Sequence, residues 1–513
     1  MPHSSENNNK RVAKNTLFLY FRMILIMLVT LYTSRVVLAE LGIKDYGIYN
    51  VVGGVVAMFS FLNNCMSSAT QRFLTFELGR GDMSRLKKVF AASLNIHIAI
   101  GIAIVLLAET VGLWFVNHKL VIAPDRMVAA NWVYQFSILT FCVNIIQVPY
   151  NAVLIAHEKM SVYAYISILE AFLKLGIVYL LVVVPADKLI AYGILVFAVQ
   201  LVIRVIYQHY CRRHYEESRF RLFWDKNLYR QMSGFAGWNL FGSVAWLMRD
   251  QGLNIVLNMF FGTAINAARG VASQVSSAVM GFISNFQVAL NPQITKNYAV
   301  GNVQEMEVLA YLGIKFSFLL LFTMGFPLCL NIDYVLHLWL VEVPDYTGLF
   351  IILIMVDSLA GNLFGVPLMT SLSATGKIRN YQIAVSCVIL CILPAGYVAL
   401  KLGCDAPSVF YISIVFTLLS GFVRFLFCRR QIGYSLRKMI REVLMPVAGV
   451  TALSLPLPIY VKSRWLGDST FADFLLLCLI AAAITVVVSW FVGLRAHERQ
   501  TLMAVIKNKI HKK

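Results

Sequence analysis

Residues 75–82 read TFELGRGD, and residues 295–302 read TKNYAVGN. A shift of 220 residues superimposes the two stretches and pairs Thr75 with Thr295, Gly81 with Gly301 and Asp82 with Asn302. The same shift pairs further residues at predicted loops and helix ends on either side, namely Gly42 with Gly262, Ala69 with Ala289, Pro124 with Pro344 and Asp125 with Asp345. Matches at successive loops and helix ends are hard to obtain by chance. The chain therefore contains two copies of one unit.

The second part of each copy continues the match after a deletion of two residues. A shift of 218 pairs Val148 with Val366, Pro149 with Pro367, Ala156 with Ala374, Lys159 with Lys377 and Tyr163 with Tyr381. The repeated halves then cover about 16–210 and 233–428. What lies outside the repeat is the N-terminus, a basic segment between the halves and the last 85 or so residues.

The composition places both halves in a membrane. Of the 513 residues, 59% are hydrophobic and only 13% are charged, and the mean hydropathy is +0.72. Soluble domains carry about 45–50% apolar and about 25% charged residues. The apolar surface of this chain is too large to be buried in a soluble fold, so much of it must contact lipid.

Fourteen segments are long and apolar enough to be transmembrane helices, each needing about 20 residues. Their approximate ranges are 16–40, 47–69, 89–116, 127–155, 161–184, 189–210, 233–260, 266–290, 309–332, 347–372, 381–400, 408–428, 443–461 and 473–493. A count of twelve or thirteen is the alternative, because some ends are uncertain. The predicted fold is an all-α polytopic membrane protein.

The 44 Lys and Arg residues are unevenly distributed over the predicted loops. If the N-terminus is cytoplasmic, 29 lie on the cytoplasmic side, 7 on the opposite side and 8 inside spans. This bias follows the positive-inside rule and predicts that both termini are cytoplasmic. The net charge of +19 therefore indicates orientation and contact with anionic lipids, and it does not indicate a nucleic-acid partner.

The polar N-terminus and long first apolar segment predict no cleaved signal peptide.

Four regions follow from the repeat and the spans. We predict an N-lobe of six helices (1–210), a basic cytoplasmic linker (211–232), a C-lobe of six helices (233–428) and two further helices with a basic tail (429–513). Six is even, so the two pseudo-symmetric lobes run in the same sense. Two like-oriented lobes around a central cleft are typical of transporters that work by alternating access.

The sequence lacks the signatures of membrane enzymes. No P-loop occurs, and the predicted external loops are short. The pairs His157-Glu158 and His497-Glu498 begin like a zinc-protease motif, but Ser161 and Thr501 stand where the second histidine is needed. The nine cysteines are scattered without a Cys-x-x-Cys pair. We predict no catalytic residue, no metal and no cofactor.

Basic residues inside spans are candidates for substrate binding, because charges in hydrocarbon usually face a wet cavity or a partner. Arg22 and Arg249 lie on equivalent faces of the leading helix of each half, and both could offer charge to a phosphate in the cleft. Snorkelling is the alternative for Arg22, and pairing with Asp250 or another helix is the alternative for Arg249. Arg35 and Arg269 lie toward the external helix ends and either bind a head group or anchor the helix at the interface.

Acidic residues inside spans are candidates for ion coupling. Asp357 has no evident sequence partner, which makes it the first candidate for proton binding; Asp250 is a second. Glu170 and Lys174 are spaced for an intrahelical ion pair, with a proton-linked role as the alternative. Lys315 is expected to snorkel to the interface.

A run of polar residues in the seventh and eighth spans, which includes Asn254 and Asn258, is dense for a membrane segment. Such a run could line a site for a hydroxyl-rich, sugar-bearing ligand. The alternative is that these side chains join helices to each other by hydrogen bonds.

Short loop motifs carry a family resemblance. Residues 41–49 (LGIKDYGIY), 76–82 (FELGRGD), 291–294 (NPQI) and 298–302 (YAVGN) resemble the polysaccharide, O-antigen-type flippases of the multidrug/oligosaccharidyl-lipid/polysaccharide exporter superfamily, which have the MATE-like fold. The resemblance implies translocation of an undecaprenyl-pyrophosphate-linked oligosaccharide from the cytoplasmic to the periplasmic leaflet, driven by an ion gradient.

Three other functions stay open. A multidrug or cation antiporter of the same superfamily is the main rival, although such exporters often carry an aspartate in the first helix, and here the first span has none. The others are a peptidoglycan-precursor flippase and a non-transporting membrane assembly protein. The expected setting is the cell inner membrane, with a monomer contacting membrane lipids, its lipid-linked substrate and polysaccharide polymerase or assembly proteins.

Overall fold

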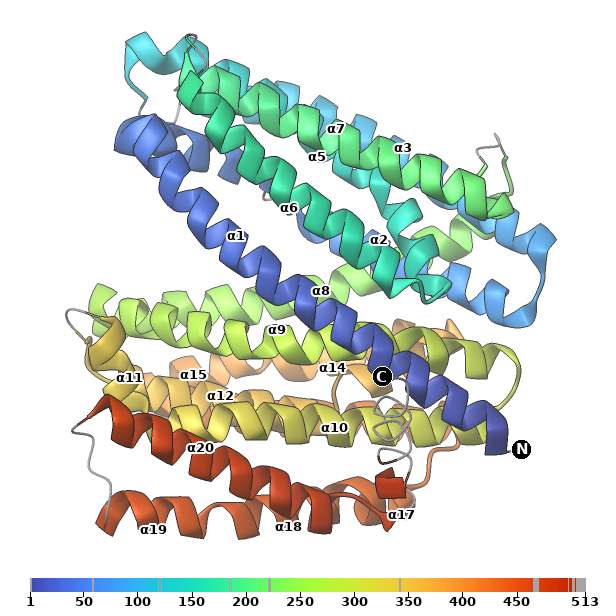
Figure 1. Ribbon diagram of the computed structural model, residues 1–513, viewed down its shortest axis with the longest axis vertical. Helices are drawn as coiled ribbons and strands as arrows, with labels where there is room; N and C mark the ends of the chain where they lie inside the picture. Colours follow the sequence, from blue (N-terminus) through green and yellow to red (C-terminus); the bar gives the residue numbers. More distant parts are fainter. Residues whose placement is uncertain are drawn as a thin grey trace, which may run out of the picture. The chain divides into compact units, whose positions relative to one another are not determined.

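The computed structural model consists mainly of long helices (Figure 1). It describes residues 2–57, 60–118, 120, 122–183, 185, 187–219, 223–340, 343–464, 470–496, 498–500 and 503. Residues 504–513 of the expected basic tail lie outside this set. The described residues form helices and no strand, as expected where lipid cannot satisfy free backbone groups. The predicted all-α fold is confirmed.

The chain divides into two compact units, which we call the N-terminal unit (Lys14–Leu240) and the C-terminal unit (Phe241–Lys513 together with Met1–Ala13). The division lies within α8, beyond the segment 211–232 that we expected as the linker. In the N-terminal unit, α5 packs against α2, α3 and α7. Its elements are α1 (Pro2–Ala57), α2 (Ser60–Arg80), α3 (Met83–Leu107), the π-helix Ala108–Gly112, α4 (Leu113–His118), the 3-10 helix Pro124–Arg126, α5 (Met127–Ala156), α6 (Met160–Val183), α7 (Lys188–His214), the 3-10 helix Glu216–Ser218 and the start of α8 (Lys226–Phe261).

In the C-terminal unit, α9 and α12 pack against each other and both contact α10, while α16 packs against α12, α13, α14 and α15. Its elements after α8 are α9 (Thr263–Ala299), α10 (Val303–Leu330), α11 (Ile332–Trp339), α12 (Thr347–Leu363), α13 (Val366–Thr375), α14 (Arg379–Leu390), α15 (Ile392–Lys401), α16 (Ser408–Ile432), α17 (Leu436–Met439), the π-helix Ile440–Leu444, α18 (Met445–Ser454), α19 (Pro456–Arg464), α20 (Phe471–Val488) and the π-helix Ser489–Gly493.

The repeated glycines have the same backbone geometry in both units. Gly42 has φ 73° and ψ 167°, and Gly262 has φ 77° and ψ −168°. Only glycine adopts this region readily, because a Cβ would clash with the backbone. Each glycine therefore separates the leading helix of its unit from the helix that follows.

The second pair of repeated positions also has one local structure. Gly81 and Gly301 both have positive φ, 74° and 79°. The next residues cap the following helices: Asp82 accepts a hydrogen bond from the backbone N of Arg85 at 2.9 Å, and Asn302 accepts one from Glu305 at 3.2 Å. Side-chain acceptors at this position satisfy the free N–H groups of a helix start. The sequence repeat thus corresponds to a repeat of turns and caps.

We predict that Gly262→Ala destabilises the protein by about 1–3 kcal/mol, the usual cost of a non-glycine residue in this backbone region. The measurement is the melting temperature of the purified protein in detergent. Gly234→Ala is the matched control: Gly234 is helical, and a Cβ added there would meet no other atom within 4 Å. This substitution should leave the melting temperature unchanged or raise it. Equal melting of Gly262→Ala and wild type would contradict the assigned backbone geometry.

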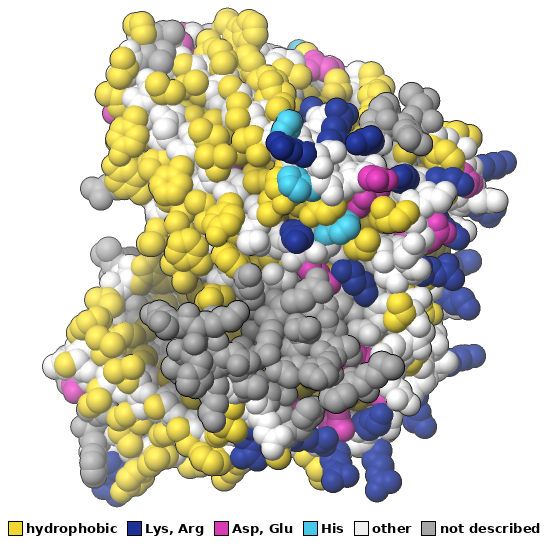
Figure 2. All heavy atoms as spheres, turned by 45° about the vertical axis from the view of Figure 1, so that its right-hand side comes forward, with side chains coloured by type: hydrophobic (Ala, Val, Ile, Leu, Met, Phe, Trp, Pro, Cys, Tyr) yellow, Lys and Arg dark blue, Asp and Glu magenta, His cyan; other side chains and the backbone are white. Residues whose placement is uncertain are grey.

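Ten of the helices in the described residues are long and apolar enough to cross a membrane. They match the third to sixth and the ninth to fourteenth predicted spans. The other four predicted spans lie on α1, α2, α8 and α9, which carry more polar and charged residues. Lys and Arg side chains of each unit gather toward one side of the visible face, and apolar side chains cover much of the rest (Figure 2).

Lys315 does not snorkel. Its side chain is 1% exposed, and its Nζ donates to both carboxylate oxygens of Glu498 at 2.6 Å. The expectation from sequence was wrong because it considered only the helix of Lys315. Glu498, which follows α20, supplies the opposite charge, and a paired, buried lysine needs no contact with the interface.

Candidate functional site

Arg249 joins three helices inside the C-terminal unit. It lies on α8, is 6% exposed, and its Nη2 donates both to Asp357 Oδ2 on α12 and to Ser413 Oγ on α16. Its Cζ also lies 4.6 Å from the centroid of the Trp246 ring, one helical turn earlier. A buried guanidinium is tolerated only with such compensation. We call Arg249, Asp357, Ser413 and Trp246 the arginine cluster.

Asp357 has one engaged and one free oxygen. Its Oδ2 accepts from Arg249 and from Ser413 Oγ at 3.4 Å. Its Oδ1 is buried and has no hydrogen-bond partner among the described residues. An unpaired carboxylate oxygen away from water is unfavourable. Asp357 is therefore ion-paired through one oxygen only, and it is not the lone acid that its sequence context suggested.

A second ion pair lies at the α8–α9 contact. Arg269 Nη2 donates to Asp250 Oδ1 at 2.6 Å, with side chains 8% and 52% exposed. Arg269 Nε is buried and has no partner among the described atoms. From sequence, Arg249 was expected to face the cleft or to pair with an acid, and Arg269 to bind a head group or to anchor its helix. Both are ion-paired in the structure.

The polar run joins helices to one another at several points. Asn266 Nδ2 donates to the backbone O and to Oδ1 of Asn254, at 3.0 and 3.1 Å. Gln287 Nε2 donates to Ser317 Oγ at 3.2 Å and to Asn362 Oδ1 at 3.3 Å. These contacts favour interhelical hydrogen bonding over a sugar-binding role for the side chains involved. Asn258, by contrast, is exposed.

In the N-terminal unit, the candidate residues form two separate groups. Lys174 Nζ donates to Glu170 Oε1 at 2.7 Å, which confirms the predicted intrahelical pair, and Gln200 Nε2 from α7 donates to the same oxygen at 2.7 Å. The guanidinium of Arg22 lies 4.8 Å from the centroid of the Tyr163 ring. The side chain of Arg35 lies outside the described residues.

The arginine cluster occurs in only one copy of the repeat. A shift of 220 places Arg249 on Val29, and shifts of 220 or 218 place Asp357 on Ser137 or Leu139. None of these residues can form an ion pair. The charged residues of the cluster are therefore specific to the C-terminal unit, although the helices that carry them have counterparts in the other half of the repeat.

Sequence reasoning missed three important residues. Ser413 and Trp246 belong to the arginine cluster, and the position of Trp246 three residues before Arg249 was the available signal. Arg126 was counted only as a loop charge. It donates to Asp45 through Nε at 2.9 Å and to Asp187 through Nη1 at 2.5 Å, and so it ties three helix ends of the N-terminal unit together.

Comparison with known proteins agrees with this architecture. No family model matches the sequence, and no curated protein matches it. Among solved structures, an outward-facing conformation of a multidrug resistance MATE family transporter of the MOP superfamily aligns with a TM-score of 0.71 over 83% of this chain and 96% of that chain, at 13% identity. The chain has the MATE fold.

Two further MATE structures give the same result. MATE in the bent conformation aligns with a TM-score of 0.72 at 13% identity, covering 83% of this chain and 95% of that one. The MATE transporter ClbM in complex with Rb+ aligns with a TM-score of 0.69 at 15% identity, covering 83% and 96%. At identities this low, the similarity establishes the fold and does not identify a substrate.

Among the described residues, no group of three or more His, Cys, Asp and Glu side chains could hold a metal ion.

Proposed function

We propose that this protein is a flippase that moves an undecaprenyl-pyrophosphate-linked oligosaccharide from the cytoplasmic to the periplasmic leaflet of the inner membrane. Transport proceeds by alternating access of two lobes and is driven by an ion gradient. The observation that carries the proposal is the buried Arg249 and its ion pair with Asp357 inside a MATE fold. Charged groups retained within membrane helices usually mark a substrate or ion pathway.

The chemistry of Arg249 suits an anionic ligand. A guanidinium presents a planar fork of donors that matches phosphate oxygens as well as carboxylate oxygens. A pyrophosphate could therefore take the place of Asp357 on Arg249 without leaving the arginine uncompensated. A cationic drug offers no group that could do so.

Asp357 supplies the link to a proton. A proton on its free Oδ1 neutralises the carboxylate and weakens its bond to Arg249. The arginine is then free to bind phosphate, so the anion and the ionised carboxylate of Asp357 compete for one guanidinium.

A multidrug or cation antiporter is the second candidate function. It is favoured by the first of the similar structures, which is a multidrug resistance transporter, and by the half-exposed carboxylate of Asp250. A cation would bind at Asp250 in competition with Arg269. This alternative predicts cationic substrates and no requirement for Arg249 in anion binding.

Depletion of the protein from cells that depend on it separates the two functions. We expect undecaprenyl-linked oligosaccharide to accumulate at least about tenfold, measured by mass spectrometry of extracted lipids, while surface polysaccharide is lost. A strain carrying the wild-type gene on a plasmid is the control. Increased sensitivity to cationic drugs with no change in the lipid-linked oligosaccharide would contradict the flippase and support the antiporter.

A further inference from the structure

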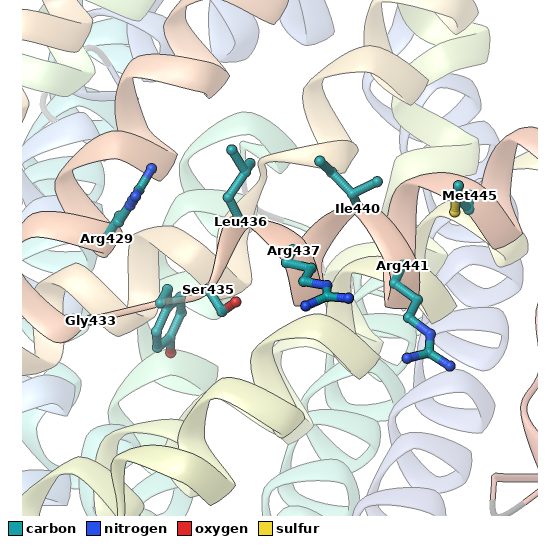
Figure 3. Close-up of a pocket in the computed structure, with 9 residues that line it drawn as sticks. Arg429, Gly433, Ser435, Leu436, Arg437, Ile440, Arg441 and Met445 are labelled. Carbon is teal, nitrogen blue, oxygen red and sulfur yellow. The ribbon is translucent and has the colours of Figure 1, made fainter.

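A groove of about 870 Å³ lies where α16 ends and the next membrane helix begins (Figure 3). It is contained in the C-terminal unit and is separate from the arginine cluster. The lining residues that matter for binding are Arg429, Leu436, Arg437, Ile440, Arg441 and Met445. The groove is thus lined by three arginines and no carboxylate.

The three arginines of the groove carry uncompensated charge. Arg429, Arg437 and Arg441 are exposed, and no salt bridge links them to any acid in the described part of the chain. The nearest acids along the chain are engaged elsewhere: Glu442 accepts from Arg495 at 2.8 Å. Three like charges around one groove repel each other, and an anion bound between them would relieve this repulsion.

Glu307, the other carboxylate that contacts this segment, is also engaged. It accepts from Lys438 Nζ at 2.8 Å, from the backbone N of Ser435 at 2.7 Å and from Tyr311 OH at 3.1 Å. These bonds hold the turn between α16 and α17 against α10. The backbone that carries the groove arginines is therefore anchored before any ligand binds.

Apolar side chains of the groove lie beside the charged ones. Ile440 is 40% exposed and Met445 is 64% exposed. In Figure 3, Leu436 and Ile440 leave the helix on one side, whereas Arg437 and Arg441 point to the other. Each pair is spaced four residues apart, which places its members on one helix face. The segment is amphipathic along its length.

The groove also lies at the ends of two candidate membrane helices. It joins two candidate spans, Ser408–Ile432 and Leu436–Arg464, so its arginines are at the ends of membrane helices. The distribution of basic residues predicts that this side is cytoplasmic. Anionic lipids of that leaflet attract Lys and Arg clustered at helix ends.

We propose that this groove binds an anionic phospholipid. The phosphate of the headgroup is held by Arg437 and Arg441, Arg429 at the end of α16 adds positive charge to the same groove, and the acyl chains pack against Leu436, Ile440 and Met445. Free inorganic phosphate would satisfy the arginines but would leave the apolar side chains exposed. A phospholipid matches both parts of the groove and is present in excess in the bilayer.

Lipid binding to the full-length protein tests this site. The protein is purified in detergent, and its affinities for phosphatidylglycerol and phosphatidylcholine are compared by native mass spectrometry and by the rise in melting temperature. Wild type should prefer phosphatidylglycerol. The triple variant R429Q/R437Q/R441Q should bind phosphatidylglycerol about 100-fold more weakly, because each arginine near an anionic lipid contributes about fivefold.

A control variant matches the charge change elsewhere. R213Q/R219Q/R230Q removes three exposed arginines of the N-terminal unit and should keep the full preference for phosphatidylglycerol. The melting temperature of both variants in phosphatidylcholine reports whether they fold. An unchanged preference in the groove variant, an equal loss in the control, or displacement of phosphatidylglycerol by inorganic phosphate or by undecaprenyl diphosphate would overturn the proposal.

Discussion

Arg249→Ala is expected to abolish export of the surface polysaccharide while the protein still reaches the membrane. The substitution removes the guanidinium that we assign to the pyrophosphate, and no other basic side chain belongs to the arginine cluster as the structure describes it. We expect transport in reconstituted vesicles to fall by at least about 100-fold. This corresponds to the loss of one charge-assisted phosphate contact of about 3 kcal/mol.

Loss of transport by Arg249→Ala could also arise from instability. Removing one partner of a buried ion pair costs about 3–5 kcal/mol, whereas replacing both by apolar residues is often neutral. The matched variant is therefore Arg249→Met combined with Asp357→Leu. It should melt within a few degrees of wild type and still fail to transport. Restored transport in this double variant would show that the pair is structural and would remove Arg249 from the mechanism.

Asp357→Asn is expected to remove the pH dependence of anion binding. In wild type, Asp357 must take up a proton before Arg249 is free. Affinity for undecaprenyl diphosphate should therefore decrease as the pH rises. Asparagine is neutral at every pH and leaves Arg249 free, so binding should be tight and flat with pH.

The measurement for Asp357→Asn is the dissociation constant of undecaprenyl diphosphate between pH 5.5 and 8, for wild type and variant in the same detergent. Asp405→Asn, in an exposed loop before α16, is the control and should keep the wild-type slope, since the ionisation of the ligand itself is the same in all three proteins. A wild-type slope in Asp357→Asn would eliminate this carboxylate as the coupling group. In vesicles, the same variant should lose its response to an imposed proton gradient.

Much of the fold was predictable because its signals are local. The presence of most spans could be predicted from apolar length, and the ten helices that qualify by length and composition correspond to ten of the fourteen predicted spans. The pairs Gly42 with Gly262 and Gly81 with Gly301 were visible as sequence matches, and they have matching positive φ values. A glycine required by backbone geometry stays recognisable when the side chains around it change.

The candidate site was predictable only residue by residue. Arg249, Asp357, Asp250 and Arg269 stood out because ionisable groups are rare in membrane helices. The partners of these residues could not be identified from the sequence. Arg249 was considered with its neighbour Asp250, yet it bonds to Asp357, 108 residues away, while Asp250 bonds to Arg269. Adjacent residues on a helix point about 100° apart, so neighbours in sequence rarely share a partner.

The sequence by itself determined that this chain is a helical membrane protein made of two repeated halves with a biased distribution of charge. These properties depend on composition, apolar length and local backbone preference. Only the tertiary structure decided which charges pair, as at Arg249 with Asp357 and at Lys315 with Glu498. Such pairs are set by the rotation and register of packed helices, and a change of one residue in either would bring different side chains into contact.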